Sequence, residues 1–209
     1  MARAFAEIAF TQSVRDTQTQ QGSADSYSKF LTPEAERGDR LGGAEQEFIS
    51  ARDGFYQASV SETNWPYVQF RGGPAGFLKV LNYKTIAYAD FRGNRQYVSA
   101  GNLTVNDRVS LILMDYPNRR RLKIWGRVKL VGRSEDPDLV SSLQIEGYRA
   151  LPERAVVITI EAFDWNCPQH IPQRLTAQEM EPLLSQMRNQ IAELTEENAE
   201  LKSWLKPTK

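Results

Sequence analysis

Alternation of apolar and polar residues with a period of two dominates the middle of the chain. Short runs rich in β-branched and aromatic residues are separated by turn residues such as Asn, Gly and Pro. This pattern is typical of half-buried strands. Seven runs fit it: residues 55–60, 66–70, 77–81, 85–89, 109–114, 122–131 and 156–163. Seven short strands at this spacing predict a mainly β fold, an antiparallel barrel that is closed or nearly closed.

Helical periodicity flanks these strands. Residues 3–21 carry a narrow apolar stripe, and a second short helix is expected over residues 25–31. This leader is expected to lie as an arm across another surface, the alternative being a frayed terminus. Residues 44–51 predict a helix before the first strand, and residues 136–148 predict one before the last.

The C-terminal segment shows a heptad pattern, because its apolar residues alternate in steps of four and three. One core position holds Leu184, Ile191, Asn198 and Leu205. The other holds Met180, Met187, Leu194 and Leu201. A β-branched residue and a lone Asn at the first position favour two parallel strands, with Glu197 and Lys202 at flanking positions. We expect a parallel coiled coil on a molecular two-fold axis or, alternatively, an amphipathic helix packed on its own barrel.

These patterns divide the chain into a helical N-terminal arm (1–43), a barrel (44–175) and a C-terminal helix (176–209). A length of 209 residues, 41% of them hydrophobic, is ordinary for one core with appendages. Lys and Arg number 26, as do Asp and Glu, so no global field attracts nucleic acid or an anionic membrane. Any anion site must therefore be local.

Two unique residues narrow the possible chemistry. Cys167 is the only cysteine and His170 the only histidine, so neither an internal disulfide nor an ordinary zinc site is expected. No serine lies in a nucleophile elbow that would use His170 for hydrolysis. No apolar run has the length of a membrane span, and the N-terminus lacks a secretory core. We expect a cytoplasmic protein.

Residues 87–103 form the strongest candidate for a binding site. An apolar strand breaks at Asp90, and the chain then delivers Arg95 and Gln96 into a short helical turn that Asn94 is placed to cap. The start of a helix presents unpaired N–H groups and the positive end of its dipole. The planar guanidinium of Arg95 suits a phosphate, so an anion site is expected here.

Two neighbouring segments add cationic side chains. A period of two puts Gln69 and Arg71 on one face of their strand. The hairpin over residues 115–126 carries Arg119, Arg120 and Arg121 near its tip, where alternation sends the middle arginine to the opposite face. The alternative for this basic run is a solvated turn. The glycine-rich stretch at residues 72–76 permits close approach of a ligand, but a plain loop explains it equally well.

The order of these motifs over residues 45–175 resembles the pyridoxamine 5'-phosphate oxidase-like flavoproteins, the FMN-binding split-barrel family, and in particular their flavin-nucleotide-binding branch. The matching residues in chain order are Pro66 with Gln69, Lys79, Ala89 with Asp90, and Asn94, Arg95 and Gln96. The resemblance implies an antiparallel split β-barrel with flanking helices and FMN as the cofactor. It also implies a homodimer with two FMN sites at the subunit interface.

The resemblance further implies which residues contact FMN. Lys79 would reach a cofactor or substrate phosphate, and Arg121 rather than Arg119 would face the flavin. The proline-flanked passage over residues 165–174 matches a region that contacts the FMN of the dimer. The full set of expected cofactor-binding residues is Gln69, Arg71, Lys79, Ala89, Asp90, Asn94, Arg95, Gln96, Arg121, Trp165, Gln169 and Arg174.

The function implied is that of a flavin oxidoreductase acting on a small-molecule substrate or electron donor. Gln69 and Gln96 replace cations of the true oxidases, and their Arg-x-His substrate pair is not evident, so oxidation of pyridoxamine phosphate itself is not implied. The alternatives are a carrier or sensor that binds flavin, deazaflavin or haem without turnover, and a purely structural dimerisation module.

Overall fold

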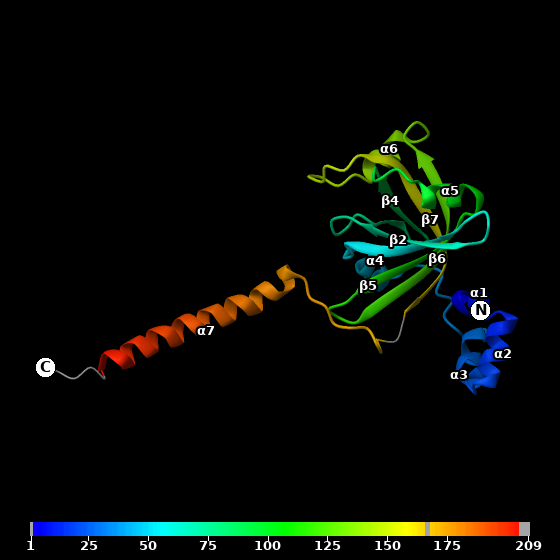
Figure 1. Ribbon diagram of the computed structural model, residues 1–209. Helices are drawn as coiled ribbons and strands as arrows, with labels where there is room; N and C mark the ends of the chain where they lie inside the picture. The colour runs from blue at the N-terminus through cyan, green and yellow to red at the C-terminus, as the bar shows by residue number, and fades with distance from the viewer. Residues whose placement is uncertain (1, 166–167, 205–209) are drawn as a thin grey trace. The chain divides into compact units, whose positions relative to one another are not determined.

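The computed structural model describes residues 2–165 and 168–204 (Figure 1). The chain divides into two compact units. The first comprises Met1–Asp115 and Arg120–Gln169, and the second Tyr116–Arg119 and His170–Lys209. Cys167, the single cysteine, and Leu205, the last residue of the heptad seam, lie outside the described residues.

Seven antiparallel strands form one sheet in the order β2-β1-β5-β6-β7-β4-β3. Their bounds are β1 Gly54–Val60, β2 Pro66–Gly72, β3 Lys79–Asn82, β4 Thr85–Phe91, β5 Arg108–Asp115, β6 Arg120–Gly132 and β7 Pro152–Trp165. The predicted mainly β, antiparallel split barrel is confirmed. The longest strands, β6 and β7, extend beyond the predicted runs because their ends are paired as well: Arg120 and Arg121 pair with β5, and the ladder between β6 and β7 runs from Leu122 with Trp165 to Gly132 with Arg154.

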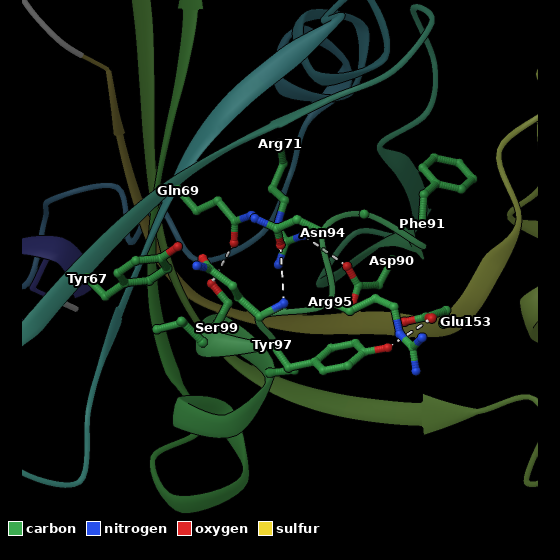
Figure 2. A pocket seen from close by; sticks show the side chains of 14 residues that line it. Tyr67, Gln69, Arg71, Asp90, Phe91, Asn94, Arg95, Tyr97, Ser99 and Glu153 are labelled. Carbon is green, nitrogen blue, oxygen red and sulfur yellow. Dashed lines mark hydrogen bonds and ion pairs between the residues drawn. The ribbon is translucent and has the colours of Figure 1, made fainter.

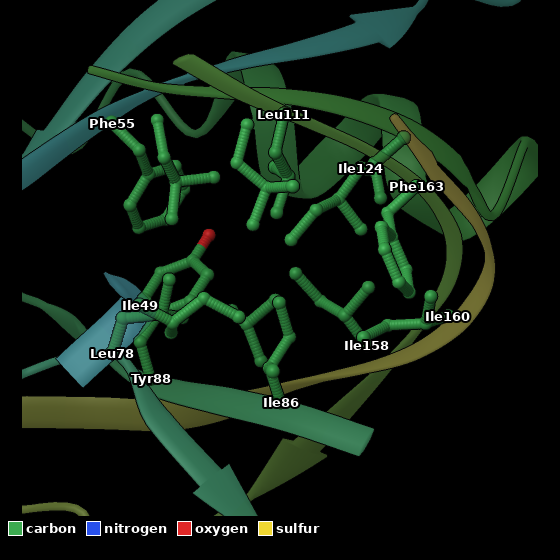
Figure 3. Close-up of a cluster of buried hydrophobic side chains, with 14 of the residues drawn as sticks. Ile49, Phe55, Leu78, Ile86, Tyr88, Leu111, Ile124, Ile158, Ile160 and Phe163 are labelled. Atoms are coloured by element: carbon green, nitrogen blue, oxygen red, sulfur yellow. The ribbon is translucent and has the colours of Figure 1, made fainter. Parts of the chain in front are cut away.

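The inward side chains of this sheet make the main hydrophobic core (Figure 3). Helix α4 (Gly43–Ser50), predicted over residues 44–51, adds Phe48 and Ile49 to it. Tyr88 is also fully buried, and its hydroxyl donates to Oε1 of Gln57 at 2.8 Å. Burial raises the pKa of Tyr88, so the hydroxyl stays protonated and acts as a donor.

The N-terminal helices differ from the single helix predicted over residues 3–21. That prediction is wrong in the middle: α1 (Ala4–Ala9) and α2 (Gln12–Gln20) are separated at Phe10 and Thr11. The ring of Phe10 packs edge-on against Tyr27, 5.8 Å between centroids, so a contact distant in sequence accompanies the break. The helix expected over residues 25–31 is present as α3 (Ala24–Ser28) and η1 (Lys29–Leu31).

The described part of this N-terminal region contacts the outer side of β6 and β7. Arg3 Nη2 lies 3.0 Å from Asp164 Oδ1, and the ring of Phe5 lies 4.8 Å from that of Trp125. The backbone N–H of Phe163 donates to the carbonyl of Gly38 at 2.9 Å. These contacts attach the leader to the barrel at three points.

The helix between the last two strands is shorter than predicted. It begins as expected, because Asp136 accepts a hydrogen bond from the backbone N–H of Leu139 at 2.9 Å, but α6 spans only Pro137–Ser142. The extension to residue 148 is wrong, since the chain turns after Leu143 and Gly147 adopts a left-handed backbone with φ of 75°. Helix α6 covers a second apolar cluster, which includes Ala87, Ala89 and Val140.

Two helices remain. Helix α5 (Val98–Val105) follows β4, and α7 (Ala177–Trp204) is a 28-residue helix in the second unit. Within the described residues, no helix combines the length and the apolar character that a membrane span requires.

Candidate functional site

A polar pocket opens where β2, the end of β4 and the start of α5 meet (Figure 2). Six of the twelve residues expected to bind the cofactor line it together: Gln69, Arg71, Asp90, Asn94, Arg95 and Gln96. The other lining residues are Tyr67, Phe91, Gly93, Tyr97, Val98, Ser99, Ala100 and Glu153. The structure therefore places β2 beside the segment over residues 87–103, which was expected to form an anion site.

Strand β2 supplies one wall through its period of two. Tyr67, Gln69 and Arg71 point to the pocket, whereas the residues between them are exposed on the other face. Oε1 of Gln69 accepts a hydrogen bond from the hydroxyl of Ser99 at 3.2 Å. This bond links the strand to the first turn of α5.

Arg71 connects this wall to β4. Its Nη1 donates to Oδ1 of Asp90 at 2.9 Å, and Arg154 on β7 approaches Oδ2 of the same carboxylate with its Nε at 3.4 Å. The Arg71 side chain is 17% exposed, and its buried Nε has no hydrogen-bond partner among the described residues. A buried guanidinium N–H without an acceptor is costly, so an acceptor that reached Arg71 would stabilise this site.

The loop between β4 and α5 has an uncommon backbone. Arg95 and Tyr97 both have positive φ, 63° and 53°, a region that residues other than glycine seldom occupy. The backbone N–H of Gln96 donates to Oδ1 of Asn94 at 3.2 Å. Asn94 therefore caps the turn, as expected, but the helix itself starts later, at Val98, with Tyr97 as its N-cap residue.

This geometry leaves the start of α5 open toward the pocket. The first N–H groups of a helix have no acceptor within the helix, and they form the positive end of its dipole. Val98, Ser99 and Ala100 occupy these positions and line the pocket. The backbone at this point offers hydrogen bonds to an anion.

Glu153, at the start of β7, contacts Tyr97 and two arginines at the edge of the pocket. Its Oε1 accepts from the hydroxyl of Tyr97 at 3.1 Å, and its Oε2 lies 3.3 Å from Nη2 of Arg154. Arg92 is more distant, with its Nε at 3.9 Å. A hydrogen bond with Tyr97 and the nearby negative charge of Glu153 raise the pKa of Arg95, which keeps this exposed guanidinium charged.

The pocket and its immediate partners therefore carry a net positive charge. Four guanidinium groups, those of Arg71, Arg92, Arg95 and Arg154, face two carboxylates, those of Asp90 and Glu153. The balance is two positive charges in a protein of zero net charge. Such a cluster matches a phosphate monoester, which carries close to two negative charges at neutral pH.

Three expected residues on or before β6 do not line this pocket. Nζ of Lys79 donates to the carbonyl of Ser142 on α6. Ala89 is buried in the apolar cluster under α6, because adjacent strand residues face opposite sides and Asp90 takes the pocket side. Arg121 is half-buried on β6, and its Nε has no partner among the described residues.

The three expected residues beyond β6 also lie apart from the lining. The indole N–H of Trp165 donates to Oε1 of Glu45 at 2.7 Å, and Trp165 lines a second cavity together with residues of the N-terminal arm, including Phe30. Gln169 is exposed. Arg174 belongs to the second unit, where its guanidinium lies 5.0 Å from the ring centroid of Tyr116.

Several residues that line or adjoin the pocket were not predicted from the sequence. The sequence pattern could have predicted Tyr67, since it lies on the same face of its strand as Gln69 and Arg71. Glu153 and Arg154 carried no local signal, because only the pairing of β4 with β7, which sets Asp90 opposite Arg154, brings them to the pocket. No group of three potential metal ligands occurs among residues 2–165 and 168–204.

Several solved structures are similar to parts of this chain. The HupZ protein of Group A Streptococcus has a TM-score of 0.50 and 12% identity, covering 65% of this chain and 99% of that one. A putative pyridoxamine 5'-phosphate oxidase from Lactobacillus delbrueckii is 17% identical over 60% of this chain and 94% of its own, with a TM-score of 0.46. An FMN-binding protein from Syntrophomonas wolfei is 12% identical over 75% and 96%, with a TM-score of 0.46.

These identities are low, and the streptococcal structure shows a shared fold alone. No curated protein matches the chain. The family described as pyridoxamine 5'-phosphate oxidase matches residues 41–165, which is more than half of the chain and spans the whole sheet. The chain therefore belongs to the pyridoxamine 5'-phosphate oxidase family.

Proposed function

We propose that the pocket at the start of α5 binds the phosphate of FMN and that the protein is a flavin-dependent oxidoreductase. The observation that carries the proposal is the excess of guanidinium groups around an open helix N-terminus. Both features recognise the same ligand group, a phosphate, by independent means: one by charge and one by backbone hydrogen bonds.

In this proposal, different pocket residues contact the phosphate of the cofactor. Arg95 is exposed, its hydrogen-bond partner is the neutral Tyr97, and no carboxylate lies within ion-pair distance of it among the described residues, so its charge is available to the phosphate. The free Nε of Arg71 and the N–H groups at the start of α5 offer further donors. Bound FMN would supply two-electron hydride chemistry, while the protein positions the ring.

A homodimer is part of this proposal. The outer faces of β1 and β2 carry an apolar patch made of Tyr56, Val68 and Phe70, which are 41%, 60% and 57% exposed. Tyr56 and Phe70 are directly opposed across the two strands, and their rings pack at 5.5 Å. Aromatic and branched side chains gathered on a sheet face are typical of an interface. A second subunit on this patch would shield it.

The dimer also gives a role to expected cofactor residues that do not line the pocket. Lys79, Arg121, Trp165, Gln169 and Arg174 lie elsewhere on the chain. In our proposal, a site at the subunit interface receives some of them from the second subunit.

We further propose that the electron donor is a reduced nicotinamide or a small organic molecule. The protein acts in the cytoplasm.

The test compares FMN with riboflavin, which has the same ring system but lacks the phosphate. We expect absorption bands of bound flavin and a melting temperature that rises with FMN concentration, by an amount equivalent to about 2.7 kcal/mol at 100 times Kd. Riboflavin should stabilise the protein far less. Equal stabilisation by both compounds would contradict the proposed phosphate site. A melting temperature that neither compound changes would contradict flavin binding itself.

Turnover is tested separately. Anaerobic addition of reduced nicotinamide to the FMN-loaded protein should bleach the flavin absorption, and air should restore it. Stable flavin binding without reduction by any donor would favour the alternative of a carrier or sensor.

A further inference from the structure

Helix α7 has a well-defined beginning. The hydroxyl of Thr176 accepts from the backbone N–H of Glu179 at 3.2 Å, and Oε2 of Glu179 accepts from the backbone N–H of Thr176 at 2.8 Å. This reciprocal pair is a capping box. From there the helix continues to Trp204, passing Pro182, which falls on the outer side of the heptad pattern. The sequence therefore encodes one long helix rather than a chain of short ones.

The seam of this helix is exposed. None of the described residues of α7 is buried, and Ile191 and Leu194, at its centre, are 62% and 63% exposed. Helices in water owe most of their stability to packing of their apolar face. A 28-residue helix with a continuous apolar seam therefore requires a partner for that seam.

We propose that the partner is α7 of a second copy of this chain, paired in parallel and in register as a two-stranded coiled coil. The seam residues identify the partner. Ile191 at one core position and Leu194 and Leu201 at the other are the combination that two parallel strands favour. Asn198 is the lone polar residue in the seam, and in-register parallel pairing sets it against its own counterpart, where the two amides hydrogen-bond.

The flanking charges agree with this orientation. In a parallel pair, Glu197 lies beside Lys202 of the partner subunit, an attractive contact between helices. The preceding flanking residues, Gln190 and Thr195, are uncharged and introduce no repulsion. Arg188 is already engaged within its own helix, with Nη1 2.6 Å from Oε1 of Glu181. An antiparallel pair loses the contact between Glu197 and Lys202 and sets Asn198 against apolar side chains.

The orientation has a consequence at the base of the helix. Within the second unit, Nε2 of Gln173 donates to the carbonyl of Pro117 at 2.9 Å, so the segment before α7 is attached to the turn between β5 and β6. Parallel pairing brings these turns of both copies to the same end of the coil. Antiparallel pairing would separate them by the helix length, about 42 Å at 1.5 Å per residue over 28 residues.

The test is disulfide formation in the full-length chain. In a Cys167→Ser background, Met187→Cys and Leu201→Cys each place one thiol in the seam, two heptads apart, and Glu196→Cys places one on the outer side of the same helix. Parallel, in-register pairing predicts that both seam variants form a disulfide-linked dimer under mild oxidation, at least ten times faster than Glu196→Cys. Flavin absorption provides a separate readout, because it reports the pocket at the start of α5 and not the contact between the helices.

Each other result overturns the proposal. Absence of cross-linking at both seam positions means that α7 packs against its own subunit, against a different partner, or against a second copy in another register or orientation. Cross-linking at only one seam position indicates another register or an antiparallel pair, and equal rates in all three variants indicate random collision. As a second measurement, Ile191→Asp should lower the rate of cross-linking at Leu201→Cys at least tenfold, and an unchanged rate also counts against the pairing.

Discussion

Nη1 of Arg71 on β2 lies 2.9 Å from Oδ1 of Asp90 on β4, although the two strands are not neighbours in the sheet. Strand β2 is one edge of the sheet, and β4 lies next to the other edge, β3. The ion pair therefore joins the two ends of the barrel where no backbone ladder connects them. The same pair forms one wall of the pocket, so closure of the barrel and construction of the site depend on the same two residues.

Replacing Asp90 by Asn should destabilise the protein by roughly 2–3 kcal/mol. Asp90 is 7% exposed, and its loss leaves Arg71 and Arg154 with uncompensated charge in a poorly solvated place. Urea denaturation measures the change in the free energy of unfolding. The matched control is Asp107→Asn, which removes an exposed pair with Arg127 and should change that free energy by less than about 1 kcal/mol. Equal effects of the two variants would contradict a structural role for the Arg71–Asp90 pair.

Arg95→Ala should weaken FMN binding by roughly 10- to 100-fold, since one charge-assisted hydrogen bond contributes about 1.5–3 kcal/mol. Because the Arg95 side chain is exposed, the melting temperature of the FMN-free protein should stay the same. Fluorescence titration with FMN measures the affinity, and Arg133→Ala, at an exposed arginine outside the pocket, is the control. An FMN affinity that survives the loss of Arg95 would exclude this residue from the phosphate site.

Local patterns predicted the strands well because each has its own alternation and turn residues. The period of two in β2 was enough to place Gln69 and Arg71 on one face, and the break after β4 was enough to group Asn94, Arg95 and Gln96, which line the pocket. Two predicted helices, over residues 3–21 and 136–148, were wrong in extent for reasons that a local sequence pattern does not show. Phe10 leaves the helix while packing against Tyr27, and the helix after Asp136 ends early near a left-handed Gly147.

The site was predicted in part for the same reason. Glu153 and Arg154 enter it through the antiparallel register of β4 and β7, a pairing between residues more than sixty positions apart. Hydrophobic periodicity reports which face of a strand is buried but not which strand lies beside it. Lys79 and Arg121 were assigned through the family resemblance, and their role at the flavin stays a prediction.

Val68→Lys should dissociate the proposed barrel dimer without unfolding the subunit. The side chain is 60% exposed in the single chain, so a charge there is tolerated, but it would be buried without a partner at the interface. Light scattering during size-exclusion chromatography measures the mass, in a chain truncated before Thr176 so that α7 cannot hold the dimer together. Val105→Lys changes a comparably exposed valine, 62%, outside the patch and should leave the mass unchanged. A dimer that persists in Val68→Lys would locate the interface elsewhere.

Asp39 should contribute a pH-dependent increment of stability. Burial by itself would raise the pKa of its carboxyl, but the hydrogen bond and charge of Lys84, together with Arg37, outweigh burial and lower the pKa. A lowered pKa in the folded state gives stability that is present above the ordinary value near 4 and is lost as the pH falls through the folded value. Asp39→Asn should therefore reduce stability at pH 7 by up to about 1 kcal/mol, with the difference vanishing in acid.

The control for this prediction is Lys84→Gln, which removes the partner at 3.1 Å. If the pair is responsible, the two single variants and the double variant should show similar losses at pH 7, measured by urea denaturation at several pH values. Additive losses would mean that Asp39 and Lys84 stabilise the protein independently.

Tyr88→Phe should destabilise the core by roughly 1–3 kcal/mol, although the ring is retained. The hydroxyl of Tyr88 is the hydrogen-bond donor to Oε1 of Gln57, a fully buried side chain whose Nε2 already has no partner among the described residues. Removing that donor leaves the amide unsatisfied at both ends. Tyr97→Phe is the matched control. It removes an exposed hydroxyl that donates a hydrogen bond to Glu153, and it should change the free energy of unfolding by less than about 0.5 kcal/mol. Thermal melting of the two variants compares them directly, and equal melting temperatures would show that Gln57 obtains its hydrogen bonds from buried water.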